Sequence, residues 1–478
     1  MATITSTGIG SGLDVNSIVT QLVALERRPI QQLQSEAGQL DARLSSFGKI
    51  QSNLDALRSA ARSLSDTSTW KAATASSSDA TAVGVTVASG STAGSYSVSV
   101  TDLAAAQMNA SSALPSSGSV LGQGTLTIDI GTWAANLSSF TPKAGSSSVS
   151  ITIGPGEDTL EKVRDKINGT SGLGVRATIV NDASGARLVM QSRSTGAENG
   201  FRIQVSDDDA VDDDNAGLSR LAYDPENAAA VSTRNQPAAN AKAVINGLAV
   251  ESATNTLANV IDGVSLTLGK KTTSAVDLTV SRDTAAMRKS IDGFVGAYND
   301  LVKLLREQTR YDAGSKSAGP LQGDRTAIAV LGQLRQAMGV SSSASGVFGR
   351  ASDIGLSVQT DGTIKTTTSK LDTAMGNLEE LQKFFATSST ESATNGLADR
   401  LRRLSDALIG TGGALPARQE GLRKLKAANA DRQEVLQDRV AATEKRLRAQ
   451  YQALDANMAR LTSLQNYVGQ QITNWNKT

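Results

Sequence analysis

Few residues of this chain have the types and spacing that enzymatic chemistry requires. Its 478 residues include no histidine and no cysteine, which excludes imidazole acid–base catalysis, thiolate nucleophiles and disulfides. Ser46 and Lys49 match a bare Ser-x-x-Lys pattern, but Phe47 belongs to an apolar stripe and no Lys-Thr-Gly sequence accompanies them. The chain contains no phosphate-binding loop sequence, and no carboxylate pair stands out for glycoside hydrolysis. We therefore expect a structural or interaction protein without catalytic residues or a cofactor.

An acidic run at residues 207–214 is the strongest candidate for a metal site. It contains the clusters Asp207–Asp209 and Asp212–Asp214. Calcium prefers such oxygen ligands, but the run lacks the glycine and terminal glutamate of an EF-hand loop. The favoured interpretation is a solvated surface loop with no metal, and calcium binding stays open as the alternative.

The element that organises the chain is a long helix near its C-terminus. Residues 422–468 contain neither glycine nor proline, and their apolar residues recur mostly at steps of 3, 4 or 7. Such a helix is about 70 Å long at ~1.5 Å per residue, so it needs a partner along its length. A second stripe, at residues 33–64, supplies that partner, with Pro29 ahead of it permitting a break or kink.

We expect the two ends to pair as an antiparallel coiled-coil or helical-bundle stem. The residues predicted to pack in it are Leu33, Leu40, Phe47, Leu54, Leu447, Leu454 and Leu461. The alternative is that each end forms a helical bundle of its own.

Between the two helical ends, the sequence pattern is typical of β-strands. Alternating β-branched segments separated by Ser/Gly turns run from about residue 69 to 281, with one short helix at residues 160–167. Helices return at residues 284–308, 326–338, 370–385 and 397–409, with a hairpin around Asp361-Gly362. The predicted fold is a multidomain α+β protein with β-rich, sandwich-like lobes inserted between helical ends. Its expected domains are residues 1–68, 69–107 with 236–283, 108–235, and 284–478.

The composition of the chain argues against several classes of binding partner and against a membrane span. Lys plus Arg (47) balances Asp plus Glu (46), so we expect neither nucleic-acid binding nor attraction to an anionic membrane. No apolar run approaches the ~20 residues that span a bilayer. The first residues are polar and lack the basic start of a signal peptide, so we expect any export to use no cleaved signal.

Several segments together resemble bacterial flagellar hook-associated protein 2, the filament-cap family. They occur in the family's order and include both ends, whereas residues 109–156 resemble it least. The segments are TSTGIGSGLDVNSIVTQLVALERRP (5–29), GSYSVSVTDLAAAQ (94–107), AKAVINGLAVESATNTLANVIDGVSLTL (241–268), SIDGFVGAYNDLVKLL (290–305), GPLQGD (319–324) and IGLSVQTDGTIK (354–365). DTLEKVRDKIN (158–168) resembles a small module shared by flagellin and hook proteins.

The resemblance implies a structural role outside the cell. Family members are exported unfolded by the flagellar type III system and form a ring at the distal filament tip, where five copies are favoured here. Implied partners are flagellin, hook–filament junction proteins, an export chaperone and, in a second role, host surface glycans or mucin. The residues expected to contact flagellin or the filament are Ile4, Ile9, Leu13, Val468, Ile472 and Trp475.

Two other classes of protein remain. Flagellin and hook–filament junction proteins also place helical ends around a β-rich middle, although the SGLDVNSIV and GPLQGD segments argue against them. A coiled-coil adhesin would carry an export signal or a membrane anchor, which the sequence does not show.

Overall fold

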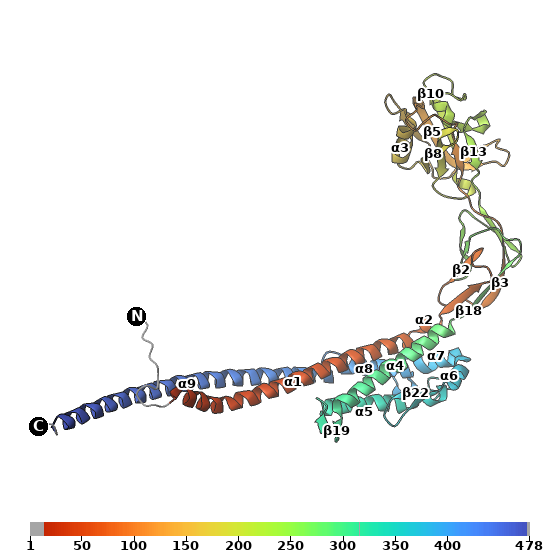
Figure 1. Ribbon diagram of the computed structural model, residues 1–478. Coiled ribbons are helices and arrows are strands. Elements are labelled where there is room, and N and C mark those ends of the chain that lie inside the picture. Colours follow the sequence, from red (N-terminus) through yellow and green to blue (C-terminus); the bar gives the residue numbers. More distant parts are fainter. Residues whose placement is uncertain (1–13, 315, 476–478) are drawn as a thin grey trace. The chain divides into compact units, whose positions relative to one another are not determined.

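The computed structural model describes residues 14–314 and 316–475, which form two compact units (Figure 1). The first unit combines residues 1–70 with 285–478, and the second comprises residues 71–284. Helices dominate the first unit and antiparallel sheets the second, as expected for a multidomain α+β fold.

The helical unit is built from both ends of the chain. Its two longest helices, α1 (Val15–Ser65) and α9 (Ala414–Trp475), run side by side (Figure 1). The shorter helices are α2 (Thr67–Trp70), α4 (Thr284–Thr309), α5 (Arg325–Gly339), α6 (Thr368–Met375), α7 (Leu378–Ala386) and α8 (Leu397–Ile409). Two small hairpins complete the unit: β19 (Tyr311–Asp312) with β20 (Ser317–Ala318), and β21 (Leu356–Val358) with β22 (Ile364–Thr366).

A buried aromatic cluster lies where α1 meets the shorter helices. Phe294 of α4 and Phe384 of α7 each pack edge-on against Phe385, at centroid distances of 6.3 and 5.2 Å. Trp70 stacks on Phe385 at 5.6 Å, and its indole nitrogen donates to the carbonyl of Leu64 at 2.8 Å. Burying rings of this size contributes substantially to the hydrophobic stabilisation at this end of the stem.

Two predicted helix boundaries are wrong, and the break that Pro29 would permit does not occur in α1. α1 continues through Pro29, because packing along its length offsets the loss of one backbone hydrogen bond. α9 begins at Ala414, since Pro416 falls in the first turn, where its missing N–H has no helical partner to lose. The expected helix at residues 370–385 is two helices, separated at Gly376 and at Asn377, whose side chain caps α7 by accepting from the N–H of Glu380.

The β-rich unit contains two hydrophobic cores. The inner lobe, residues 71–107 and 237–284, packs a five-stranded sheet of order β1-β18-β3-β14-β15 and a three-stranded sheet of order β16-β17-β2 around one core. Its strands are β1 (Ala73–Ser77), β2 (Val83–Val87), β3 (Gly94–Asp102), β14 (Ala241–Ile245), β15 (Leu248–Ser252), β16 (Thr256–Ile261), β17 (Val264–Leu268) and β18 (Val276–Arg282).

The outer lobe, residues 108–236, packs two sheets and helix α3 (Leu160–Gly169) around the other core. One sheet has the order β12-β11-β10-β5-β6 with β7 also paired to β5, and the other has the order β13-β4-β9-β8. The strands are β4 (Met108–Ala110), β5 (Gly124–Trp133), β6 (Phe140–Pro142), β7 (Val149–Ile153), β8 (Val175–Asp182), β9 (Gly185–Ser192), β10 (Gly200–Asp207), β11 (Tyr223–Asp224), β12 (Ala229–Ala230) and β13 (Thr233–Gln236).

Candidate functional site

The paired end helices α1 and α9 form the candidate functional site, because they join the two ends of the chain along a shared seam. Contacts between side chains show that α1 and α9 are antiparallel. Early in α9, Gln419 donates to Gln51 at 3.1 Å; late in α9, Arg448 donates to Asn16 at 3.4 Å. Later residues of α9 therefore contact earlier residues of α1, and the two helices pair in antiparallel orientation.

The seam between the helices is apolar towards the start of α1. Val15, Val19, Val23 and Ile30 are buried there against Val440. Leu436, Leu447 and Tyr451 of α9 pack against this cluster and stay partly buried. The steps of 4 and 7 between these residues are compatible with a coiled-coil seam.

A polar side chain interrupts the seam further along. Asn429 of α9 is buried; its amide nitrogen donates to Glu36 of α1 at 3.2 Å, and its oxygen accepts from Gln433 at 2.6 Å. A one-turn slip between the helices would separate the amide nitrogen of Asn429 from Glu36, its partner across the seam. Polar groups at such positions are known to select one register. Asn429 therefore favours the observed pairing over neighbouring ones.

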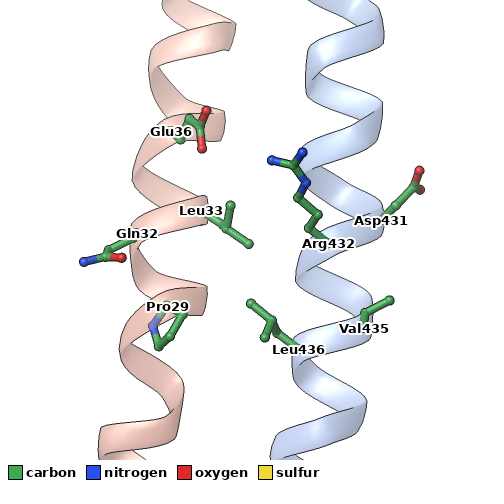
Figure 2. Close-up of a pocket in the computed structure, with 8 residues that line it drawn as sticks. All are labelled: Pro29, Gln32, Leu33, Glu36, Asp431, Arg432, Val435 and Leu436. Atoms are coloured by element: carbon green, nitrogen blue, oxygen red, sulfur yellow. The ribbon is translucent and has the colours of Figure 1, made fainter.

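The seam opens into a groove beside Pro29. Figure 2 shows Leu33 of α1 and Leu436 of α9 pointing into the space between the helices, with the side chain of Arg432 above them. The groove has a volume of about 590 Å³. Pro29 lines it and has no backbone N–H to donate within α1. The groove is thus an apolar surface on the side of the stem that the chain itself leaves accessible.

The predicted packing residues divide into three groups. Leu40, Phe47 and Leu54 are buried, and Leu33 and Leu447 are half-buried. Leu454 and Leu461 are 44% and 62% exposed, which contradicts the expectation that they pack in the stem. The physical reason is length: Asn16 already pairs with Arg448, so the described part of α1 ends before it reaches them.

The expected filament-contacting residues lie at the chain ends. Ile4, Ile9 and Leu13 lie outside the described residues. Val468 and Ile472 are exposed on α9 at 46% and 54%. Trp475 ends α9, but its side chain is outside what the structure describes. Together with Leu454, Met458 and Leu461, the exposed residues Val468 and Ile472 continue the seam beyond α1, and we call these five the distal stripe.

The base of the stem depends on residues that sequence reasoning did not single out. Asp324 accepts from the N–H groups of Thr326 and Ala327 and so caps α5. Its other carboxylate oxygen accepts from Arg418 of α9 at 2.8 and 3.0 Å. The signal was present as the final residue of the GPLQGD segment, because Asp before an apolar helix is a typical N-cap.

The sequence patterns with apparent chemistry have structural roles. Ser46 is buried, and its hydroxyl donates to Gln308 at 2.6 Å and to the carbonyl of Ala42, so the Ser-x-x-Lys match is part of the helix packing. In the acidic run, Asp207 accepts from the N–H of Ser219 and Asp212 from the N–H of Asp207. Within the described ranges, no group of three acidic side chains is placed to hold a metal ion.

Comparison with known proteins identifies the family. The model of the flagellar hook-associated protein 2 C-terminus matches residues 238–463, that of its N-terminus matches residues 11–107, and the flagellin hook IN motif matches residues 139–194. A B-type flagellar hook-associated protein 2 of Pseudomonas aeruginosa is 30% identical over 479 residues, which cover 97% of this chain and 96% of the relative. The chain belongs to the flagellar hook-associated protein 2 family.

Further hook-associated protein 2 relatives agree along the full length. The flagellar hook-associated protein 2 of Escherichia coli K12 is 29% identical and covers 99% of both chains. The crystal structure of domains D1, D2 and D3 of the flagellar cap protein from Escherichia coli superimposes with a TM-score of 0.61 at 26% identity. It covers 79% of this chain and 99% of that structure. Among the described residues of this family member, no helix is long and apolar enough to cross a membrane.

Proposed function

We propose that this protein caps the distal tip of the bacterial flagellar filament, where it promotes the folding and insertion of exported flagellin and prevents its loss. The observation that carries this proposal is the full-length relationship to hook-associated protein 2, together with the shared fold of a structure described as a flagellar cap protein. The role is mechanical: the cap confines and positions a folding subunit, with no bond made or broken.

The stem supplies the leg of such a cap. Its register is selected by Asn429 and its base is fixed by the Asp324–Arg418 ion pair. Since a long helical pair is stiff only when its seam is packed, the buried residues Phe47 and Leu54 give the leg its rigidity.

The distal stripe is the surface by which the leg contacts neighbouring subunits. Five apolar side chains on one helix face, all more than a third exposed, exceed what an isolated soluble helix normally presents. Leu461 and Ile472 both follow Arg448, which contacts Asn16 at the start of the described part of α1. Chains of flagellin, of a junction protein or of the cap itself therefore cover its far end.

Assembly and export follow from the same proposal. The cap acts as a ring of identical copies on the outside of the cell, after export through the flagellar type III channel without a cleaved signal. Before export, a chaperone binds the apolar distal stripe by helix-in-groove contact. Support for these points is the family relationship and the exposure of the stripe in the single chain.

Deleting the gene in its source bacterium tests the function. We expect cells with hooks but no filaments, and unpolymerised flagellin in the culture medium, as seen by electron microscopy and immunoblotting. Reintroducing the intact gene should restore the filaments. Normal filaments on motile deletion cells would refute the cap proposal and would favour a surface-adhesion role.

A further inference from the structure

A small pocket of the β-rich unit, lined mainly by outer-lobe residues, has the chemistry of a ligand site. It has a volume of about 250 Å³ and lies beside the two connections that join the outer lobe to the inner one. Trp133 at the end of β5 and Arg234 of β13 supply its large side chains, and both are half-buried. Gln107, Pro237, Gly200 and four alanines form the remaining wall, so most of the lining residues are small.

A row of contacting aromatic rings ends at this pocket. The guanidinium of Arg234 lies over Tyr223, with its Cζ atom 6.0 Å from the ring centre. Tyr223 meets Trp133 edge-on at 5.6 Å, Trp133 packs on Phe140 at 4.8 Å, and Arg202 lies over Phe140 at 5.0 Å. A guanidinium therefore lies over the aromatic ring at each end of this row.

The two arginines differ in their counter-charges. Arg202 pairs with Asp129 at 2.9 Å and approaches Glu226 at 3.7 Å. No carboxylate among the described residues lies within salt-bridge distance of Arg234, which nevertheless lines the pocket. A half-buried guanidinium without an acidic neighbour attracts an anion more strongly than an exposed one, because water screens it less.

The other polar groups of the pocket are already engaged. The amide nitrogen of Gln107 donates to Asn109 and to the carbonyl of Phe201, and its oxygen accepts from the N–H of Phe201. The indole nitrogen of Trp133 donates to the same carbonyl at 3.0 Å. Arg234 therefore supplies the side-chain donors that remain for a ligand. Because its guanidinium is positively charged, the pocket should prefer an anionic ligand.

We propose that this pocket binds a small carboxylate carried on a single ring. The carboxylate accepts two parallel hydrogen bonds from Arg234, and the ring lies against the indole of Trp133. The volume of about 250 Å³ equals the share of roughly eight liquid waters, which limits the ligand to one ring with its acid group. The proposal does not depend on the cap function.

Calorimetric titration of the full chain tests the proposal. The probes are benzoate, an aromatic acid, and glucuronate, a sugar acid, each compared with its neutral counterpart, benzamide or glucose. We expect at least one of the acids to bind, more weakly at higher salt, with its neutral counterpart at least tenfold weaker; which acid binds distinguishes the two sources. The absence of binding by both acids up to about 10 mM, or equal binding of a neutral counterpart, would overturn the proposal.

Variants connect binding to the named residues. Arg234→Gln should weaken binding of the acid at least tenfold. It should lower the melting temperature only slightly, because Arg234 has no described ion pair to lose and gives up one cation–π contact with Tyr223. Ala238→Leu should abolish binding by filling the pocket with the charge intact. Arg176→Gln, on the exposed β8 edge of the same lobe, is the matched control and should bind as the parent does. Undiminished binding in Arg234→Gln or in Ala238→Leu would place the ligand elsewhere.

Discussion

The two glycines of the GPLQGD segment, Gly319 and Gly323, allow a turn that side chains at these positions would strain. A Cβ atom on Gly319 would lie 2.3 Å from the carbonyl oxygen of Gln308, so the backbone of this turn and the end of α4 approach too closely for any side chain. Gly323 has a φ of +73°, a conformation that glycine adopts without steric cost. Both glycines place Asp324 where it caps α5 and binds Arg418.

Replacing Gly319 should therefore destabilise the folded protein. Gly319→Ala should lower the free energy of unfolding by about 1–3 kcal/mol, because backbone must move to admit the methyl group. Gly38→Ala is the matched control: a Cβ there meets nothing within 4 Å, so alanine should raise stability by about 0.5–1 kcal/mol through its better helix propensity. Urea denaturation measures both. Equal effects of the two substitutions would contradict this account.

Tyr298 gives the helical unit a dependence on alkaline pH. The side chain is buried, its hydroxyl has no hydrogen-bond partner among the described residues, and burial raises its pKa to about 12. Because the unfolded phenol ionises near pH ~10, the stability that the neutral phenol supplies is complete below pH ~10. It is lost as the pH rises towards 12.

Comparison with Tyr298→Phe isolates this effect. We expect the free energy of unfolding of the parent chain to fall more steeply between pH ~10 and 12 than that of the variant, which has no phenol to ionise. At neutral pH the variant should be as stable as the parent or slightly more stable, since an unpartnered buried hydroxyl is removed. Parallel pH profiles for the two proteins would disprove the assignment.

At the scale of elements, α1 and α9 stabilise the chain only where they overlap. Leu54 is fully buried in the packed part of α1, whereas Leu461 lies on the part of α9 beyond the start of α1. Leu54→Ala should therefore lower the free energy of unfolding by about 2–5 kcal/mol. Leu461→Ala should change it by less than about 0.5 kcal/mol, as is usual for exposed sites.

Thermal or denaturant unfolding of the isolated chain distinguishes the two leucines. A large cost for Leu461→Ala would mean that the distal stripe is covered within one chain after all. A small cost for Leu54→Ala would instead indicate that the base of the stem repacks around the missing side chain.

At the scale of the whole molecule, the distal stripe should matter for assembly and not for folding. The double substitution Leu461→Asp with Ile472→Asp places two charges on the stripe, which would be buried without partners in an assembled filament tip. We expect cells that carry it to lose filaments and release flagellin, while the purified chain melts as the parent does.

A matched variant checks that charge alone is not responsible. Arg460 lies near Leu461 on α9 but outside the distal stripe, so the double substitution Arg460→Asp with Arg446→Asp should leave filament growth intact. Filaments of normal number and length in the Leu461→Asp, Ile472→Asp cells would show that the stripe makes no essential contact.

Periodicity alone determined much of the fold. Helical patterns at residues 284–308 and 397–409 predicted α4 and α8, and the turn signal Asp361-Gly362 predicted the β21–β22 hairpin, because these signals act between residues close in the chain. The nested order of helix, β-structure and helix likewise predicted the α+β class. The resemblance of several segments to one family pointed to hook-associated protein 2, which the full-length comparison confirmed.

Other features depend on where distant segments meet, and only the tertiary structure decided them. The stripe at Leu454 and Leu461 has the same period as the buried seam, so the sequence could not show that their partner helix ends short of them. The contact of Asn429 with Glu36 and the pocket that brings Trp133 to Arg234 each join residues from separate elements. Burial and charge pairing are properties of neighbours in space, and a local pattern carries no information about which neighbours the fold will supply.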